Sequence, residues 1–122
     1  TASVHKAMAQ RLELSELPLS NLLALDDAGF RALFAGTPIK RTGRDRFIRN
    51  ALIASGNSKD LGLVPQIVHL LDDANAIVRG AAVWALAQLD PVRFAAEREA
   101  RFKLERDESV QTEWQVSAPK AH

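Results

Sequence analysis

Five basic residues lie within ten positions of this sequence and form its most distinctive chemical feature. The same window contains one acid, Asp45, so its local charge is +4, whereas the rest of the chain carries −3 and the whole chain +1. Ammonium and guanidinium groups gathered this closely are typical of a surface that binds phosphates. The candidate nucleic-acid-binding residues are Lys40, Arg41, Arg44, Arg46 and Arg49.

The residue order in this window predicts a helix start. Thr42 and Asp45 resemble the two ends of a capping box, so we expect a helix to begin at Gly43. Unpaired backbone N–H groups at a helix start favour an anion, whereas the helix dipole disfavours cations in the first turn. Two cations precede this start and two lie in its first turn. We therefore predict that these four converge on one helix end and bind a phosphate there.

Some of these arginines also have a structural interpretation. Arg49 lies four residues after Asp45, so a surface ion pair is as good an interpretation as a phosphate contact. Arg49 also aligns with Arg79 at an offset of 30 residues. We expect Arg79 to make a structural pair with Asp72 or Asp73. For the other four cations the alternative is a solvated basic loop, against which the isolated charge and the helix start favour nucleic acid.

The remaining candidates for chemistry are weak. The chain contains no cysteine, which excludes disulfides, thiolate metal sites and cysteine nucleophiles. The three histidines are scattered without carboxylates at ligand spacing, so no metal site and no catalytic residue is predicted. Gly56 is interpreted as a helix C-cap, because the residues after it lack the spacing of a phosphate loop. Trp84 is predicted to lie in the core, whereas Trp114 fits either the core or a stacking surface.

The elements that must position the basic window are helices. Among the 122 residues, 47% are apolar and 25% charged, which is typical of one globular domain. Apolar residues recur at helical spacing, and no strand-like alternation is present, so an all-α chain of six or seven helices is predicted. No apolar run is long enough for a membrane span and no secretion leader is recognised, so we expect a cytoplasmic protein without membrane contact.

A faint internal repeat organises these helices. Residues 48–54 align with 78–84 at an offset of 30, and 110–114 follow at a further 32. A period of this length predicts a HEAT-like α-solenoid, in which paired antiparallel helices stack on one another. We expect an N-terminal helical lead-in over 1–42, HEAT-like repeats over 43–118 and a short tail over 119–122, all in one compact domain.

One stretch is more specific than a general repeat. Residues 36–58, from Gly36-Thr37-Pro38 to Gly56-Asn57-Ser58, resemble the signature that opens the C-terminal HEAT-like region of epoxyqueuosine reductases. The preceding residues 22–34 resemble the lead-in of the same family. The resemblance covers roughly residues 20–90, and it implies that this chain corresponds to the C-terminal part of such an enzyme.

This resemblance implies a role in tRNA modification. The family reduces epoxyqueuosine to queuosine at the wobble base with cobalamin and two [4Fe–4S] clusters, which belong to an N-terminal catalytic region. This chain has no cysteine to ligate a cluster, so it is expected to hold no cofactor and to be no enzyme alone. The expected partners are the tRNA anticodon stem-loop and the N-terminal catalytic region. The alternative is a HEAT-type scaffold for protein–protein interaction.

Overall fold

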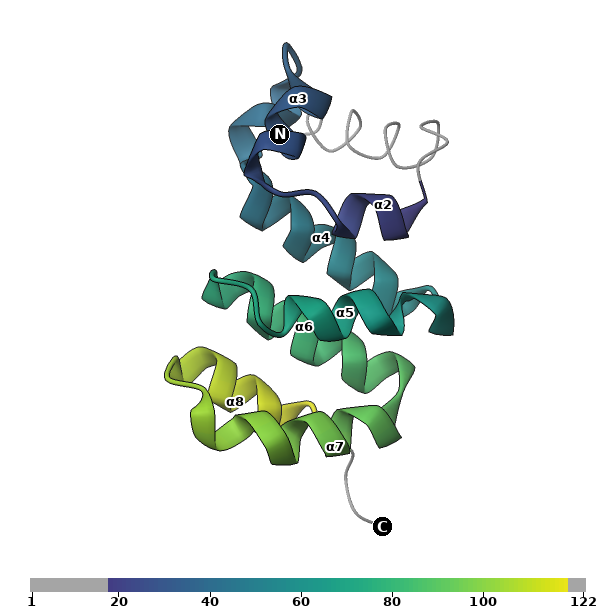
Figure 1. The fold of residues 1–122 in the computed structure, drawn as a ribbon, viewed down its shortest axis with the longest axis vertical. Coiled ribbons are helices and arrows are strands. Elements are labelled where there is room, and N and C mark those ends of the chain that lie inside the picture. The colour runs from purple at the N-terminus through teal and green to yellow at the C-terminus, as the bar shows by residue number, and fades with distance from the viewer. Residues whose placement is uncertain (1–17, 119–122) are drawn as a thin grey trace.

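A computed structural model of the chain describes residues 18–118, which form seven α-helices, three short 3₁₀ helices and no strand (Figure 1). The prediction of an all-α fold with paired helices is confirmed, whereas the finer HEAT assignment and the segment boundaries stay predictions. Residues 1–17 of the predicted lead-in and the tail 119–122 lie outside the described residues. In chain order the elements are α2 (Leu19–Leu23), α3 (Asp27–Phe34), η1 (Pro38–Thr42), α4 (Arg44–Asn57), η2 (Leu61–Leu63), α5 (Val64–Leu70), α6 (Ala76–Leu89), α7 (Pro91–Arg101), η3 (Phe102–Leu104) and α8 (Glu108–Val116).

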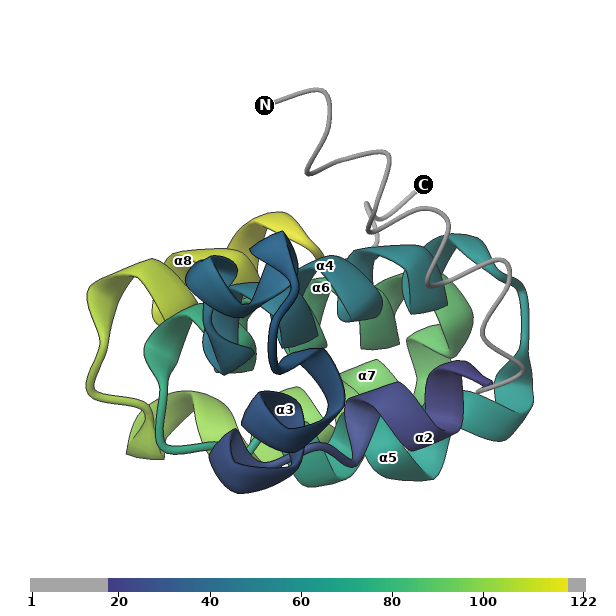
Figure 2. The ribbon, with the colours of Figure 1, turned by 90° about the horizontal axis from the view of Figure 1, so that it is seen from above.

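The helices form two layers. Figure 2, which looks along the stack, shows α4, α6 and α8 in one layer and α2, α5 and α7 in the other. Figure 1 shows the helix pairs stacked along the long axis, with α3 at one end and α7 and α8 at the other. Helix α6 lies in the middle of the stack and packs on α4, α5, α7 and α8. No helix among residues 18–118 is long and apolar enough to cross a membrane.

Polar side chains fix the helix starts in the second half of the chain. The Asn75 side-chain oxygen accepts a hydrogen bond from the Ile77 N–H at 2.8 Å, and Asp107 caps α8 in the same way. Asp90 caps α7, whose first residue is Pro91. Such caps satisfy N–H groups that a helix start leaves unpaired, and proline has no N–H to lose. These capping residues therefore mark where α6, α7 and α8 begin.

The core follows the predicted repeat. Ile48 and Val78, 30 residues apart, are both fully buried, and Val110 occupies the equivalent buried position a further 32 residues on. Helix α6 buries residues on nearly every side because neighbours in both layers cover it. The last aromatic residue joins this core. Trp114 is 2% exposed and packs against Phe94 with ring centroids 5.3 Å apart, which decides between the two alternatives left by the sequence.

Gly56 lies inside α4 and not at its C-cap, so that prediction is wrong. Helix α4 continues to Asn57, and the positive φ of 60° after it belongs to Lys59. A Cβ atom on Gly56 would lie 2.5 Å from the Trp84 ring and 3.1 Å from the Ala85 backbone. The glycine therefore permits the close approach of α4 and α6, and Trp84 is half-buried at their contact.

Candidate nucleic-acid interface

Helix α4 begins one residue later than predicted, and the capping box is not formed. Thr42 is the last residue of η1, and Gly43 takes the N-cap position without a side-chain hydrogen bond. Its φ of 84° lies in the left-handed region that residues with a Cβ rarely adopt. Pro38 at the start of η1 and the buried Ile39 hold residues 38–42 as a separate 3₁₀ turn, so Thr42 cannot serve as a cap.

The surroundings of this helix start are acidic. A shallow pocket beside Arg44 is lined by four aspartates together with Ala74 and Asn75. Carboxylates so close repel a phosphate, so the predicted phosphate site at the helix start gains no support from the structure. The four acids are Asp26, Asp27, Asp45 and Asp73.

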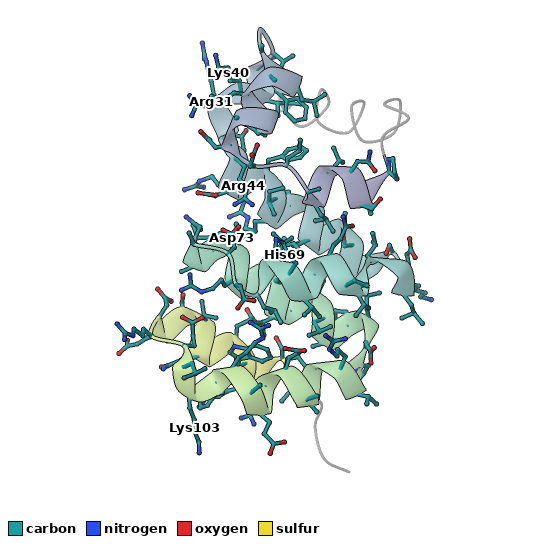
Figure 3. The ribbon with its side chains drawn as sticks, in the orientation of Figure 1. Arg31, Lys40, Arg44, His69, Asp73 and Lys103 are labelled. Atoms are coloured by element: carbon teal, nitrogen blue, oxygen red, sulfur yellow. The ribbon has the colours of Figure 1, made fainter. Side chains whose placement is uncertain are left out.

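Arg44 is bound by the protein itself. Its Nε donates to the Leu25 carbonyl oxygen at 2.9 Å, and its Nη2 lies 2.8 Å from an Asp73 carboxylate oxygen (Figure 3). Asp45 accepts a third bond at 3.0 Å. Burial by itself lowers the pKa of Arg44, but the hydrogen bonds and charges of both aspartates outweigh it and raise the pKa. The guanidinium therefore ties the start of α4 to the α2–α3 and α5–α6 connections.

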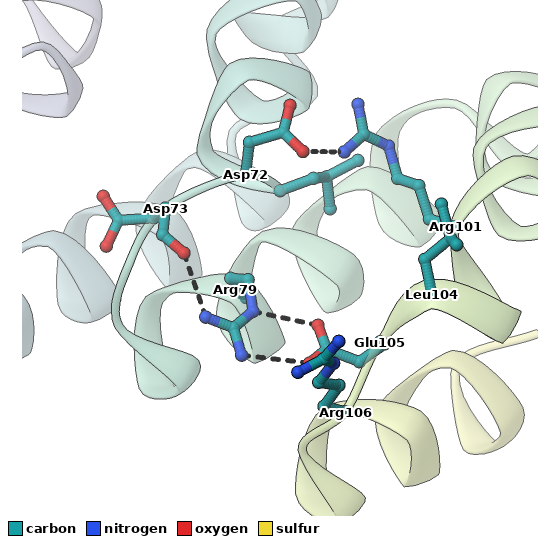
Figure 4. Close-up of a pocket in the computed structure, with 8 residues that line it drawn as sticks. Asp72, Asp73, Arg79, Arg101, Leu104, Glu105 and Arg106 are labelled. Atoms are coloured by element: carbon teal, nitrogen blue, oxygen red, sulfur yellow. Dashed lines mark hydrogen bonds and ion pairs between the residues drawn. The ribbon is translucent and has the colours of Figure 1, made fainter.

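Arg79 makes a second structural contact of this kind. Its Nε and Nη2 each donate to a Glu105 carboxylate oxygen at 2.9 Å, and its Nη1 donates to the Asp73 carbonyl oxygen at 3.0 Å (Figure 4). Its structural role agrees with the prediction, but the predicted carboxylate partners were wrong. Because Arg44 takes the Asp73 carboxylate and Arg101 takes that of Asp72, Arg79 reaches to Glu105 in the next helix pair.

Three cations of the window remain exposed, with no partner among residues 18–118. Lys40 and Arg41 lie on η1, and Arg46 lies in the first turn of α4. Within residues 18–118, none of the three side chains forms an ion pair or a hydrogen bond. We call these three residues the η1–α4 corner. Figure 3 shows Lys40 at the opposite end of the stack from Lys103.

Arg49 differs from both groups. The predicted pair with Asp45 is not formed, because that carboxylate accepts from Arg44 and from the Asn75 side-chain amide at 3.0 Å. Arg49 is half-buried and donates to the Asn50 side-chain oxygen at 3.3 Å. Its side chain lines a groove that the sequence analysis did not identify.

This groove lies across the layer of α4, α6 and α8. Its volume is about 430 Å³, and it is open to solvent on one side. The sequence held a partial signal for it, since Ile77, Gly80 and Trp84 on α6 are three and four positions apart and so share one helix face. We call it the inner groove. It is lined by Arg49, Ile53, Ala76, Ile77, Gly80, Ala81, Trp84, Ser109 and Glu113.

Comparison with known proteins identifies what this fold is similar to. The sequence matches no protein-family profile. Over 111 residues it is 28% identical to the epoxyqueuosine reductase of Bacillus subtilis, covering 90% of this chain and 29% of that protein. The reductase of Listeria monocytogenes is 30% identical over 113 residues, covering 92% of this chain and 28% of the relative. The chain is similar to one segment of the epoxyqueuosine reductases.

Solved structures agree with the sequence comparison. A crystal structure of epoxyqueuosine reductase with an epoxyqueuosine-modified tRNA-Tyr stem loop superposes on 81% of this chain with a TM-score of 0.75 and 30% identity. The match covers 27% of that reductase. The chain thus spans less than a third of the reductases that it matches. The resemblance to epoxyqueuosine reductases predicted from residues 20–90 is confirmed, whereas its assignment to a C-terminal HEAT-like region stays a prediction. The comparisons do not favour the scaffold alternative.

Proposed function

We propose that this chain is the tRNA-docking region of an epoxyqueuosine reductase. In this proposal the η1–α4 corner contacts phosphates of the anticodon stem-loop, while a catalytic region outside this chain reduces epoxyqueuosine. The residues present here do not fit an iron–sulfur cluster, because the chain has no cysteine to supply thiolate ligands. The proposal includes the cobalamin and the clusters that the family resemblance implies for the catalytic region. It also includes a cytoplasmic location for the protein.

The observation that carries the proposal is the unpaired charge of the corner. Arg44, Arg79 and Arg101 all bind carboxylates of the protein, whereas Lys40, Arg41 and Arg46 bind none among the described residues. Binding a phosphate to an unpaired surface cation costs little free energy, since no ion pair within the protein has to break. The stem loop in the similar reductase supports RNA as the source of that phosphate.

The five predicted contacts divide accordingly. In this proposal Lys40, Arg41 and Arg46 contact phosphates. Arg49 also stays a proposed RNA contact, beside Arg46 on α4. Arg44 is left out of the proposed contacts because its guanidinium is held on three sides.

The experiment is a salt titration of stem-loop affinity. An anticodon stem-loop RNA is titrated into the wild-type chain, Arg46→Gln and the control Lys103→Gln at several salt concentrations. Each lost phosphate contact flattens the slope of log affinity against log salt by about 0.7–0.9. We expect this flattening for Arg46→Gln alone, because Lys103 lies at the other end of the stack (Figure 3). Equal affinities and equal slopes for all three proteins would show that the corner is not the RNA site.

A further inference from the structure

The inner groove and the η1–α4 corner share helix α4. Arg46, Arg49 and Ile53 are three and four positions apart on α4, so they share one face of that helix. Arg46 belongs to the corner, and the other two line the groove. An RNA whose phosphates bind the corner can therefore place an adjacent nucleotide along this face of α4, over the groove.

The walls of the groove suit a flat ring with polar edges. Ile53 and Ile77 are 43% and 44% exposed, and Trp84 is half-buried beside them, so apolar surface is open to solvent. Arg49 adds N–H donors to the lining, and Glu113 adds a carboxylate, one oxygen of which accepts a hydrogen bond from the Ser117 hydroxyl. A nucleobase has apolar faces and an edge of donors and acceptors, and unpaired bases in RNA loops bind by stacking on aromatic and guanidinium groups.

We propose that the inner groove receives an unpaired nucleobase of the RNA whose phosphates bind the corner. The base stacks in the apolar part of the groove beside Trp84, while Arg49 and Glu113 contact its polar edge. This inference rests on the proposed function and adds a contact that phosphate binding does not require. It distinguishes a looped RNA from a fully paired one, because paired bases are stacked within their own helix.

Gly80 provides a way to fill the groove without disturbing the fold. A Cβ atom on Gly80 meets no atom within 4 Å, and the residue lies within α6. Leucine is a much better helix former than glycine, so Gly80→Leu keeps the helix and occupies the groove. Gly80→Ala is the matched control, because a methyl group leaves most of the groove open. Urea unfolding of both variants verifies that they fold.

The test compares two RNA probes with equal numbers of phosphates, an anticodon stem-loop and a fully paired duplex. We expect Gly80→Leu to weaken stem-loop binding about 5- to 150-fold relative to Gly80→Ala, which is the range of one lost stacking contact. Duplex affinity stays equal for the two variants. If Gly80→Leu binds the stem-loop as tightly as Gly80→Ala, the base-binding role of the groove is wrong, although the corner can still bind phosphates.

Tryptophan fluorescence gives an independent readout. A base stacked beside Trp84 quenches its emission, whereas Trp114 is buried away from the groove. The stem-loop should quench wild-type fluorescence, the duplex should not, and Trp84→Phe should abolish the difference. Binding of the stem-loop without quenching overturns the groove proposal. Failure of both RNAs to bind the wild-type chain overturns the proposed function, on which the groove proposal rests.

Discussion

Basic residues act in opposite ways in two regions, the η1–α4 corner and the edge of the stack where Arg44 and Arg79 contact Asp73 and Glu105, which we call the turn edge. At the turn edge, Arg44 and Arg79 each reach a carboxylate from another helix pair, and their side chains are 15% and 20% exposed. At the corner, Lys40, Arg41 and Arg46 are exposed and form no ion pair with any described residue. The first group joins neighbouring helix pairs, and the second leaves its charge available to a ligand.

The five cations of the basic window therefore do not share one environment. They are neighbours in sequence, but the packing of α4 on α6 directs Arg44 toward Asp73 and leaves Arg46 outside. Charge density along a sequence therefore overestimates the charge that a ligand meets. Whether a carboxylate from a distant segment reaches the cation decides its role.

Removal of the Arg79 side chain is expected to lower the free energy of unfolding more than any other change considered. Arg79→Ala removes two bonds to Glu105 and two to backbone carbonyl oxygens, and it leaves a half-buried carboxylate unpaired. We expect the free energy of unfolding to fall by about 2–4 kcal/mol. Arg46→Ala should change it by no more than about 0.5 kcal/mol. Urea denaturation of both variants measures the contrast, and similar losses would mean that the two regions do not differ.

Two glycines give a second comparison, because a Cβ atom on Gly56 would meet a neighbouring side chain whereas one on Gly80 would meet no atom. Gly56→Ala should destabilise the protein by about 1–3 kcal/mol, because its methyl group would overlap the Trp84 ring at 2.5 Å. Gly80→Ala should stabilise it by about 0.5–1 kcal/mol, since alanine favours a helix and meets no neighbouring atom. Thermal unfolding of both variants measures the sign of each change in stability. A loss of stability in Gly80→Ala would show that the groove is already filled by the protein.

The smallest effect is the response to acid at the turn edge. Burial by itself raises the pKa of Glu105 and of Asp73, but the hydrogen bonds from Arg79 and Arg44 outweigh it and lower both pKa values. Carboxyls with a lowered pKa in the folded state contribute stability that is complete above their ordinary values of 4.5 and 3.8. That stability is lost as the pH falls through the lowered values.

We therefore expect the urea concentration at the unfolding midpoint to decrease as the pH is lowered below about 4.5. The decrease should be less steep in Glu105→Gln, which has no carboxyl at this position to protonate. Glu108→Gln is the matched control, because Glu108 is exposed at the start of α8. Equal acid profiles for Glu105→Gln and the wild-type chain would contradict the importance of the turn-edge pairs.

Much of the fold could be predicted from sequence because its signals are local. The caps at Asn75, Asp90 and Asp107 act within three residues, so the breaks between helices are visible in the sequence. The 30-residue spacing of buried positions such as Ile48 and Val78 is equally visible. The start of α4 was misplaced because the capping-box pattern of Thr42 competes with the 3₁₀ turn that Pro38 begins.

The all-α class, the paired helices and the position of the basic window follow from the sequence alone. Which cations stay available depends on the packing of the helices, because Arg44 and Asp73 are 29 residues apart and meet only when α4 packs on α6. The same packing placed Trp84 against Gly56 and opened the inner groove beside Gly80. Ion pairs and grooves between helices depend on distances in space, and helical periodicity along one segment does not contain those distances.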